Sequence, residues 1–170
     1  MAPMTRNRLV LPLALGVVAS LALSACTTRH VDLKKALQVT DVGTGYFDAG
    51  IVEGNKNKIV PTITLQLKNV SNEPVDSVQL IAKFNRIGET EEWGSAPYVQ
   101  AIGTTALAPG QSTKPVVMRC DRGYTGEQPR EEMLHHSQFV DVRVELFGKY
   151  RAEGWVKLGE YKIARDLLTQ

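Results

Sequence analysis

The sequence predicts an all-β protein, an antiparallel β-sandwich of seven or eight strands with one short helix in a loop. Three observations predict it. Apolar and polar residues alternate with a period of two along most of the chain after residue 35, turn-forming residues separate these runs, and only residues 121–138 break the pattern. A small closed barrel is the alternative architecture.

The first predicted strand lies within residues 36–47, where Leu37 and Val39 alternate with polar neighbours and point inward, with Val42 a further candidate for an inward position. The glycines of residues 43–45 mark a bend or bulge in it. Residues 53–57 have strong turn chemistry and therefore form the loop that follows.

The clearest strand covers residues 58–70, because three apolar residues alternate there with polar ones: Ile63, Leu65 and Leu67. One face of this strand should be buried, and the face that carries Thr62 should be exposed to solvent. Pro61 cannot donate a backbone hydrogen bond, so we expect it at the start of the paired region or on an edge.

A turn at residues 71–74 separates this run from the next strand, residues 75–87. The residues of that strand expected to point inward are Val78, Leu80, Ala82 and Phe84. The two strands form either a hairpin or a neighbouring pair that crosses from one sheet to the other.

The middle of the chain is less regular. Residues 88–96 form a polar loop, residues 97–106 hold a short strand, and a turn precedes a further strand at residues 112–120. In residues 121–138 the early half should be loop, and Pro129 should begin a helix of one or two turns because its fixed φ suits a first helical turn.

The last two strands are predicted at residues 139–150 and 154–163, joined by a turn. The first of them alternates charged residues with four apolar ones that should point inward: Val140, Val142, Val144 and Leu146. The tail, residues 164–170, is expected to be short and helical.

The start of the chain has the organisation of an export signal. Arg6 and Arg8 precede an apolar stretch that ends in Leu23, Ser24, Ala25 and Cys26. These four residues resemble the lipobox of bacterial lipoproteins, which implies that the Cys26 thiol takes a diacylglyceryl group and that the chain is cut before it. A transmembrane anchor and a non-lipidated signal peptide are the alternatives, but the apolar stretch is short of the ~20 residues that a membrane span needs.

This interpretation divides the chain into a lipoprotein signal peptide (residues 1–25), a tether (residues 26–35) and one β-sandwich domain (residues 36–170). Thr27 follows the cysteine. By resemblance to enterobacterial sorting, where Asp at that place retains a lipoprotein in the inner membrane, Thr27 implies the outer membrane with the domain facing the periplasm. The inner membrane is the alternative location.

The charge of the mature chain limits its partners. Without Arg6 and Arg8 the 20 Lys and Arg residues become 18, which equals the number of Asp and Glu residues. A neutral domain lacks the basic footprint that nucleic acid or a polybasic membrane contact requires. We therefore expect no nucleic-acid partner, and membrane attachment only through the N-terminal lipid.

A lipidated Cys26 leaves Cys120 without a partner in the chain. We expect Cys120 to be buried, because a free cysteine behaves as a small hydrophobe and an exposed one is a liability in an oxidising compartment. The alternative is a reactive thiol whose pKa is lowered by Arg119 and Arg122.

The turn chemistry of residues 60–118 carries a second resemblance. A strand ends in Asn-x-Ser, a Glu-Pro-Val turn leads to a strand that ends near a glycine, and a Leu-x-Pro-Gly turn precedes a third: Asn69-Val70-Ser71, Glu73-Pro74-Val75, Gly88 and Leu107-Ala108-Pro109-Gly110. This order resembles that of FxLYD-type domains, an immunoglobulin-like sandwich family of bacterial envelope proteins. The resemblance implies an immunoglobulin-like fold and a role in binding or scaffolding, with no catalytic residues.

No spacing in the sequence indicates a catalytic site or a cofactor, so we expect a protein that is not an enzyme. His135 and His136 are weak candidates for a metal site, since adjacent histidines point apart and their spacing is not one that zinc sites use. Possible partner contacts are the loop aromatics Trp93, Tyr98 and Tyr124. The alternative is that these rings cap the ends of the core.

Together these features predict a non-enzymatic envelope lipoprotein whose periplasm-facing sandwich binds or scaffolds another envelope component. The alternative function is a small-molecule or metal-binding lipoprotein that uses the loop at residues 121–138.

Overall fold

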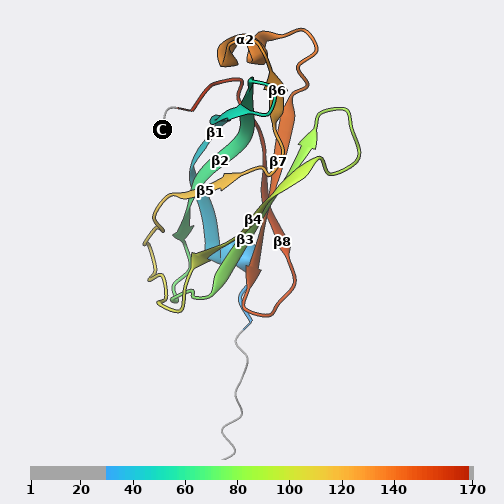
Figure 1. The fold of residues 1–170 in the computed structure, drawn as a ribbon. Helices are drawn as coiled ribbons and strands as arrows, with labels where there is room; N and C mark the ends of the chain where they lie inside the picture. Colours follow the sequence, from blue (N-terminus) through green and yellow to red (C-terminus); the bar gives the residue numbers. More distant parts are fainter. Residues whose placement is uncertain (1–29, 169–170) are drawn as a thin grey trace, which may run out of the picture.

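The computed structural model describes residues 30–168, and within them eight strands form two antiparallel sheets of four (Figure 1). The first sheet contains β1 (Leu37–Val52), β2 (Lys56–Asn69), β5 (Val116–Arg119) and β6 (Tyr124–Gly126), and the second contains β4 (Gly94–Ile102), β3 (Val78–Arg86), β7 (Val142–Tyr150) and β8 (Val156–Lys162) in that order. Two short helices, α1 (Leu33–Ala36) and α2 (Arg130–His135), complete the described chain. The predicted sandwich is confirmed, with two short helices instead of one.

Strand β2 is the centre of the first sheet. It pairs with β1 along one edge, from Leu37 opposite Asn69 to Val52 opposite Lys56, and with β5 and β6 along the other. Its predicted inward residues are fully buried, but part of the face that was expected to be exposed to solvent is buried as well. Thr62 is only 1% exposed, and its hydroxyl donates to the carbonyl oxygen of Val60 over 3.2 Å.

Pro61 lies inside this central strand, so the prediction that it stands at the start or on an edge is wrong. Tyr46, the residue opposite it in β1, turns its own N–H and C=O away from β2. The nitrogen of Pro61 therefore faces the other side of β2, in the gap between the residues that pair with β6 and those that pair with β5. A missing donor costs little there, because no strand is paired at that position.

Strands β3 and β7 form the centre of the second sheet and pair from Val78 opposite Tyr150 to Arg86 opposite Val142. Because β2 and β3 belong to different sheets, the chain crosses the sandwich between them, and the hairpin alternative is wrong. The residues predicted to point inward from β3 are all 0% exposed: Val78, Leu80, Ala82 and Phe84. In β7 the prediction holds from Val142 onward, whereas Val140 precedes the strand and is half-buried.

The domain begins before residue 36, where the predicted tether ends. Val31 and Leu33 are 8% and 2% exposed and belong to the same core cluster as the strands. Asp32 caps α1, and its carboxylate accepts a hydrogen bond from the backbone N–H of Lys34 over 3.1 Å. The alternation of apolar and polar residues in this segment is too short to predict structure from the sequence. Burial of Val31 and Leu33 in the core holds the segment in place.

The end of the chain is extended, and the prediction of a helical tail is wrong. Residues 163–168, here called the C-terminal strap, run along the outer edge of β1. The N–H of Tyr46 donates to the carbonyl oxygen of Asp166 over 2.8 Å, and the N–H of Leu168 donates to the carbonyl oxygen of Tyr46 over 2.9 Å. The strap thus satisfies backbone groups that an uncovered edge strand would leave unpaired.

Two further boundaries differ from the prediction. Strand β4 begins at Gly94, so the preceding loop is shorter than predicted, and β5 occupies only four residues of the predicted 112–120 strand. Within residues 30–168, no helix has the length and apolar character that crossing a membrane requires.

Candidate functional site

Segment 121–138 folds at one end of the sandwich, where β6 and α2 lie next to each other (Figure 1). We call this the α2 end. It contains a shallow concavity of about 250 Å³, lined by Tyr124, Thr125, Gln128, Met133, His136, Gln138 and Phe139. The described chain begins at the opposite end of the sandwich from α2 and β6 (Figure 1).

Four aromatic rings form the base of the α2 end, and we call them the aromatic cluster: Tyr46, Trp93, Tyr124 and Phe139. The Tyr124 ring is central. Its centroid lies 5.0 Å from that of Trp93 in a stacked arrangement and 4.6 Å from that of Phe139 in a tilted one. The guanidinium of Arg86 covers Trp93 and Tyr124, at 4.8 and 5.5 Å from the ring centroids. These contacts join both sheets at this end.

Hydrogen bonding fixes the tyrosine that lines the concavity. The Tyr124 hydroxyl donates to the carbonyl oxygen of Val140 over 2.8 Å. Burial raises the pKa of Tyr124, and the nearby Arg86 only partly opposes this, so the hydroxyl keeps its proton and remains a donor at neutral pH. Tyr46 lies deeper, at 0% exposed, and burial raises its pKa as well.

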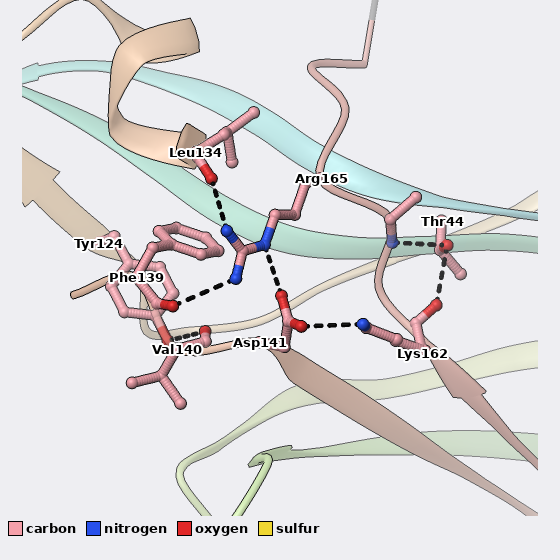
Figure 2. Close-up of polar contacts among 9 residues, drawn as sticks. Thr44, Tyr124, Leu134, Phe139, Val140, Asp141, Lys162 and Arg165 are labelled. Atoms are coloured by element: carbon pink, nitrogen blue, oxygen red, sulfur yellow. Dashed lines mark hydrogen bonds and ion pairs between the residues drawn. The ribbon is translucent and has the colours of Figure 1, made fainter. Parts of the chain in front are cut away.

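A cluster of polar contacts holds α2 and Phe139 in place (Figure 2). The Arg165 guanidinium, from the C-terminal strap, donates to the carbonyl oxygens of Leu134 and Phe139 over 3.1 and 3.3 Å. It also pairs with the Asp141 carboxylate over 2.6 Å, and that carboxylate contacts Lys162 over 2.8 Å. These two cations, Lys162 first, hold the pKa of Asp141 below its usual value. One strap residue therefore ties together α2, the concavity and the start of β7.

The structure brings two of the three predicted interface residues together. Trp93 and Tyr124 stack on each other and pack against the core, as the alternative prediction of core-capping rings describes. Tyr124 also lines the concavity, whereas Trp93 does not line it and contacts the ring of Tyr124. Tyr98 lies on β4 with 67% of its surface exposed, and it belongs neither to the aromatic cluster nor to the lining of the concavity.

His135 and His136 are both exposed at the end of α2. His136 lines the concavity, and its Nδ1 accepts a hydrogen bond from the backbone N–H of Gln138 over 3.2 Å. In residues 30–168 no three or more His, Cys, Asp and Glu side chains are grouped so as to hold a metal ion.

Cys120 is 5% exposed, which confirms the prediction that it is buried. Burial raises the pKa of its thiol to about 12, and the neighbouring Arg122 lowers it only partly. The predicted alternative, a thiol activated by the flanking arginines, is therefore wrong, because a protonated thiol at neutral pH is a poor nucleophile. The sulfur instead packs tightly against Gly94, where an added Cβ would lie 2.7 Å from it.

Several residues of this site were not indicated by the sequence. The sequence predicts Phe139 at the start of a strand, Arg165 in the tail and Arg86 near the end of a strand, and none of these positions indicates a site. Met133 carried a usable signal, because it follows two glutamates in the predicted helix and is apolar. For the other three the signal was absent, since their contacts join elements that are far apart in the chain.

The lining of the concavity suits binding. Tyr124, Met133 and Phe139 offer apolar contact, and the threonine, glutamine and histidine side chains around them offer hydrogen-bond donors and acceptors. Aromatic and methionine side chains backed by a rigid core are the kind of anchors found at the centres of protein interfaces.

No protein-family model matches the sequence, and no curated protein matches it. Among solved structures, the chain is similar to the structural-genomics target SoR45, with 14% sequence identity over 78% of this chain and 89% of that one, and a TM-score of 0.40. It is also similar to a Bordetella pertussis protein solved as a candidate ApaA protein, with 16% identity over 76% and 93% of the two chains and a TM-score of 0.38. Similarity at this level does not indicate a common function.

Leu23, Ser24, Ala25 and Cys26 lie outside the residues that the structure describes. Signal cleavage and lipidation therefore stay predictions from the sequence.

Proposed function

We propose that this protein is a non-enzymatic envelope lipoprotein, anchored in the outer membrane through Cys26, whose α2 end binds another protein of the envelope. One observation carries the proposal: α2 and β6, which supply residues that line the concavity, lie at the end of the sandwich opposite to where the described chain begins (Figure 1). An anchor a few residues ahead of His30 leaves the α2 end pointing away from the membrane, where a periplasmic partner can reach it.

The rigidity of the α2 end supports the proposal. The Tyr124 ring is stacked on Trp93 and its hydroxyl is hydrogen-bonded, and Arg165 binds the backbone carbonyl oxygens of Leu134 and Phe139. A surface that is already ordered loses little conformational entropy when a partner binds, so more of the contact energy contributes to affinity.

The anchor rests on the lipobox resemblance and on simple energetics. Acyl chains bring roughly 0.8 kcal/mol per buried methylene group, and more than one chain makes attachment effectively stable. The resemblance of residues 60–118 to FxLYD-type, immunoglobulin-like envelope domains agrees with a binding role, since that resemblance implies no catalytic residues.

The alternative function, small-molecule or metal binding by residues 121–138, has less support. Ligand pockets usually measure roughly 300–1,000 Å³ and enclose most of the ligand. The concavity here is about 250 Å³ and open, which suits one or two side chains of a protein partner better.

A photoreactive amino acid in place of Gln138, on the rim of the concavity, tests the partner site in intact cells. We expect a cross-linked adduct of defined mass that is missing when the same amino acid replaces Thr104, an exposed residue of the opposite end. Adding Thr125→Arg, which places a guanidinium over the concavity, should abolish the adduct. The same adducts from both positions, or none from Gln138, would contradict the proposed site.

The anchor is tested separately. Mass spectrometry of the mature N-terminus should find a diacylglyceryl-modified Cys26, and Cys26→Ser should release the protein from the membrane fraction. Retention of the serine variant in the membrane with its leading segment uncut would show that the anchor is of another kind.

A further inference from the structure

We propose that the end of the sandwich opposite the α2 end rests on the phospholipid surface, with Trp155 seated at the level of the headgroups. This inference depends on the lipid anchor of the proposed function. It adds a second point of contact with the membrane, which would restrict how the domain turns about its anchor.

The turn between β7 and β8 lies beside the start of the described chain (Figure 1). The Nδ1 atom of His30 is 3.0 Å from a carboxylate oxygen of Glu153, which belongs to this turn. Only residues 27–29 separate His30 from Cys26. At roughly 3.3–3.6 Å per extended residue, the Cα of Cys26 is within about 14 Å of that of His30. A lipid on Cys26 therefore keeps this turn close to the headgroup layer.

Trp155 is the side chain of this turn that suits the interface. It is 43% exposed, although tryptophan is a residue that proteins usually bury in large part. Tryptophan is enriched where membrane meets water, because its ring is apolar and its N–H can hydrogen-bond to headgroups and water. Val70, 49% exposed, lies at the same end, where its N–H donates to the carbonyl oxygen of Ala36, the last residue of α1.

The charges around Trp155 fit a phospholipid surface. The ammonium of Lys149 lies 5.3 Å from the centroid of the Trp155 ring, which places a cation where a lipid phosphate would be met. Two further cations of this end pair with carboxylates, Arg151 with Asp76 over 2.9 Å and Lys35 with Asp32 over 3.4 Å. The contact therefore depends on the aromatic ring and the anchor, in keeping with the neutral charge of the mature chain.

The sequence has two tryptophans, and the structure places them at opposite ends, so each reports on one end. The mature protein, which carries its lipid on Cys26, is reconstituted in phosphatidylethanolamine–phosphatidylcholine vesicles, with and without lipids brominated on the acyl chains, which quench nearby tryptophans. We expect the brominated lipids to remove at least half of the Trp155 fluorescence in Trp93→Phe, and to leave the fluorescence of Trp93 in Trp155→Phe within a tenth of its value.

Because Trp93 supports the aromatic cluster, its replacement could disturb the fold. The Trp155 signal is therefore also obtained by subtracting the Trp155→Phe spectrum from that of the unsubstituted protein, which leaves the cluster intact. Protein that sediments with the vesicles but shows no quenching of Trp155, or equal quenching of both tryptophans, overturns this inference alone. Protein that does not sediment with the vesicles contradicts the lipid anchor itself, and this inference with it.

Discussion

Asn69, at the end of β2, shows how one residue organises an end of the sandwich. Its side chain is 0% exposed, and its amide group donates to the carbonyl oxygens of Glu73 and Leu107, both over 2.8 Å. Its side-chain oxygen accepts from the N–H and the hydroxyl of Ser71, over 3.0 and 2.7 Å. All the hydrogen-bonding capacity of the amide is used, so the Asn-x-Ser pattern in the sequence reflects a buried junction between two loops.

Asn69→Asp should destabilise the protein strongly, because it replaces a double donor with an acceptor that faces two carbonyl oxygens. A buried polar group left without its partner costs about 1–3 kcal/mol, so we expect the free energy of unfolding to fall by at least about 2 kcal/mol. Urea denaturation at pH 7 measures this change. The control is Asn72→Asp, the same substitution at an exposed position three residues away, which should change the free energy of unfolding by less than about 0.5 kcal/mol. Equal effects of the two substitutions would contradict the role given to Asn69.

At the scale of elements, the C-terminal strap is the clearest case of one segment that depends on another. Edge strands expose unpaired backbone groups, and the strap covers those of β1 at Tyr46. It approaches β1 so closely that Gly45 has no room for a side chain: an added Cβ would lie 2.8 Å from Leu168 Cγ and 2.9 Å from the carbonyl oxygen of Asp166. A glycine is needed here for space.

Gly45→Ala should therefore displace the strap while leaving the strand in place. The amide hydrogen of Tyr46 is bonded to the strap, so its exchange with solvent should become at least tenfold faster in this variant. Gly43→Ala is the matched control, because a Cβ at Gly43 meets nothing within 4 Å in the same strand. Hydrogen exchange followed by NMR compares the two variants. An unchanged exchange rate at Tyr46 in Gly45→Ala would show that the strap does not protect this edge.

At the scale of the whole molecule, Asp141 connects the pieces of the α2 end. It contacts Arg165 of the strap and Lys162 at the end of β8, and Arg165 in turn holds α2 through the Leu134 carbonyl oxygen (Figure 2). These cations lower the pKa of Asp141 from its ordinary value of 3.8. Its ionised form is thus favoured by the native state, and its ionisation is linked to global stability.

The sign of this linkage predicts a pH dependence. Because the pKa of Asp141 is lower in the folded chain, its stabilisation is fully present above pH 3.8 and is lost as the pH falls through the lower, folded value. Asp141→Asn should therefore reduce stability at pH 6 and make the loss of stability below about pH 4 less steep than in the unsubstituted protein. Urea denaturation between about pH 2.5 and pH 6, in steps of roughly half a pH unit, measures both effects. Glu91→Gln, in an exposed loop, is the control, and parallel curves for Asp141→Asn and the unsubstituted protein would rule out the linkage.

The sequence predicted the fold best where a local pattern shows which side chains are buried. The alternation in β3 and β7 identified their buried residues correctly, because each of these strands has one face toward the core along its whole length. For the candidate site, the sequence pointed to Tyr124, Trp93 and the loop at residues 121–138, since aromatic residues in a long irregular segment stand out. It did not separate Tyr98 from these two, because the pattern that selects aromatic residues does not show which of them the fold brings together.

By itself, the sequence determined the class of fold and the positions of most strands, since a period of two is a local property that follows from strand geometry. The tertiary structure alone decided which strands are neighbours, where Pro61 is tolerated, and that the tail is an extended strap held at Asp141. These features depend on partners that lie tens of residues away along the chain. No local pattern contains them, because the physical reason for each, an unpaired edge or a group that needs a hydrogen bond, exists only after the two sheets have packed.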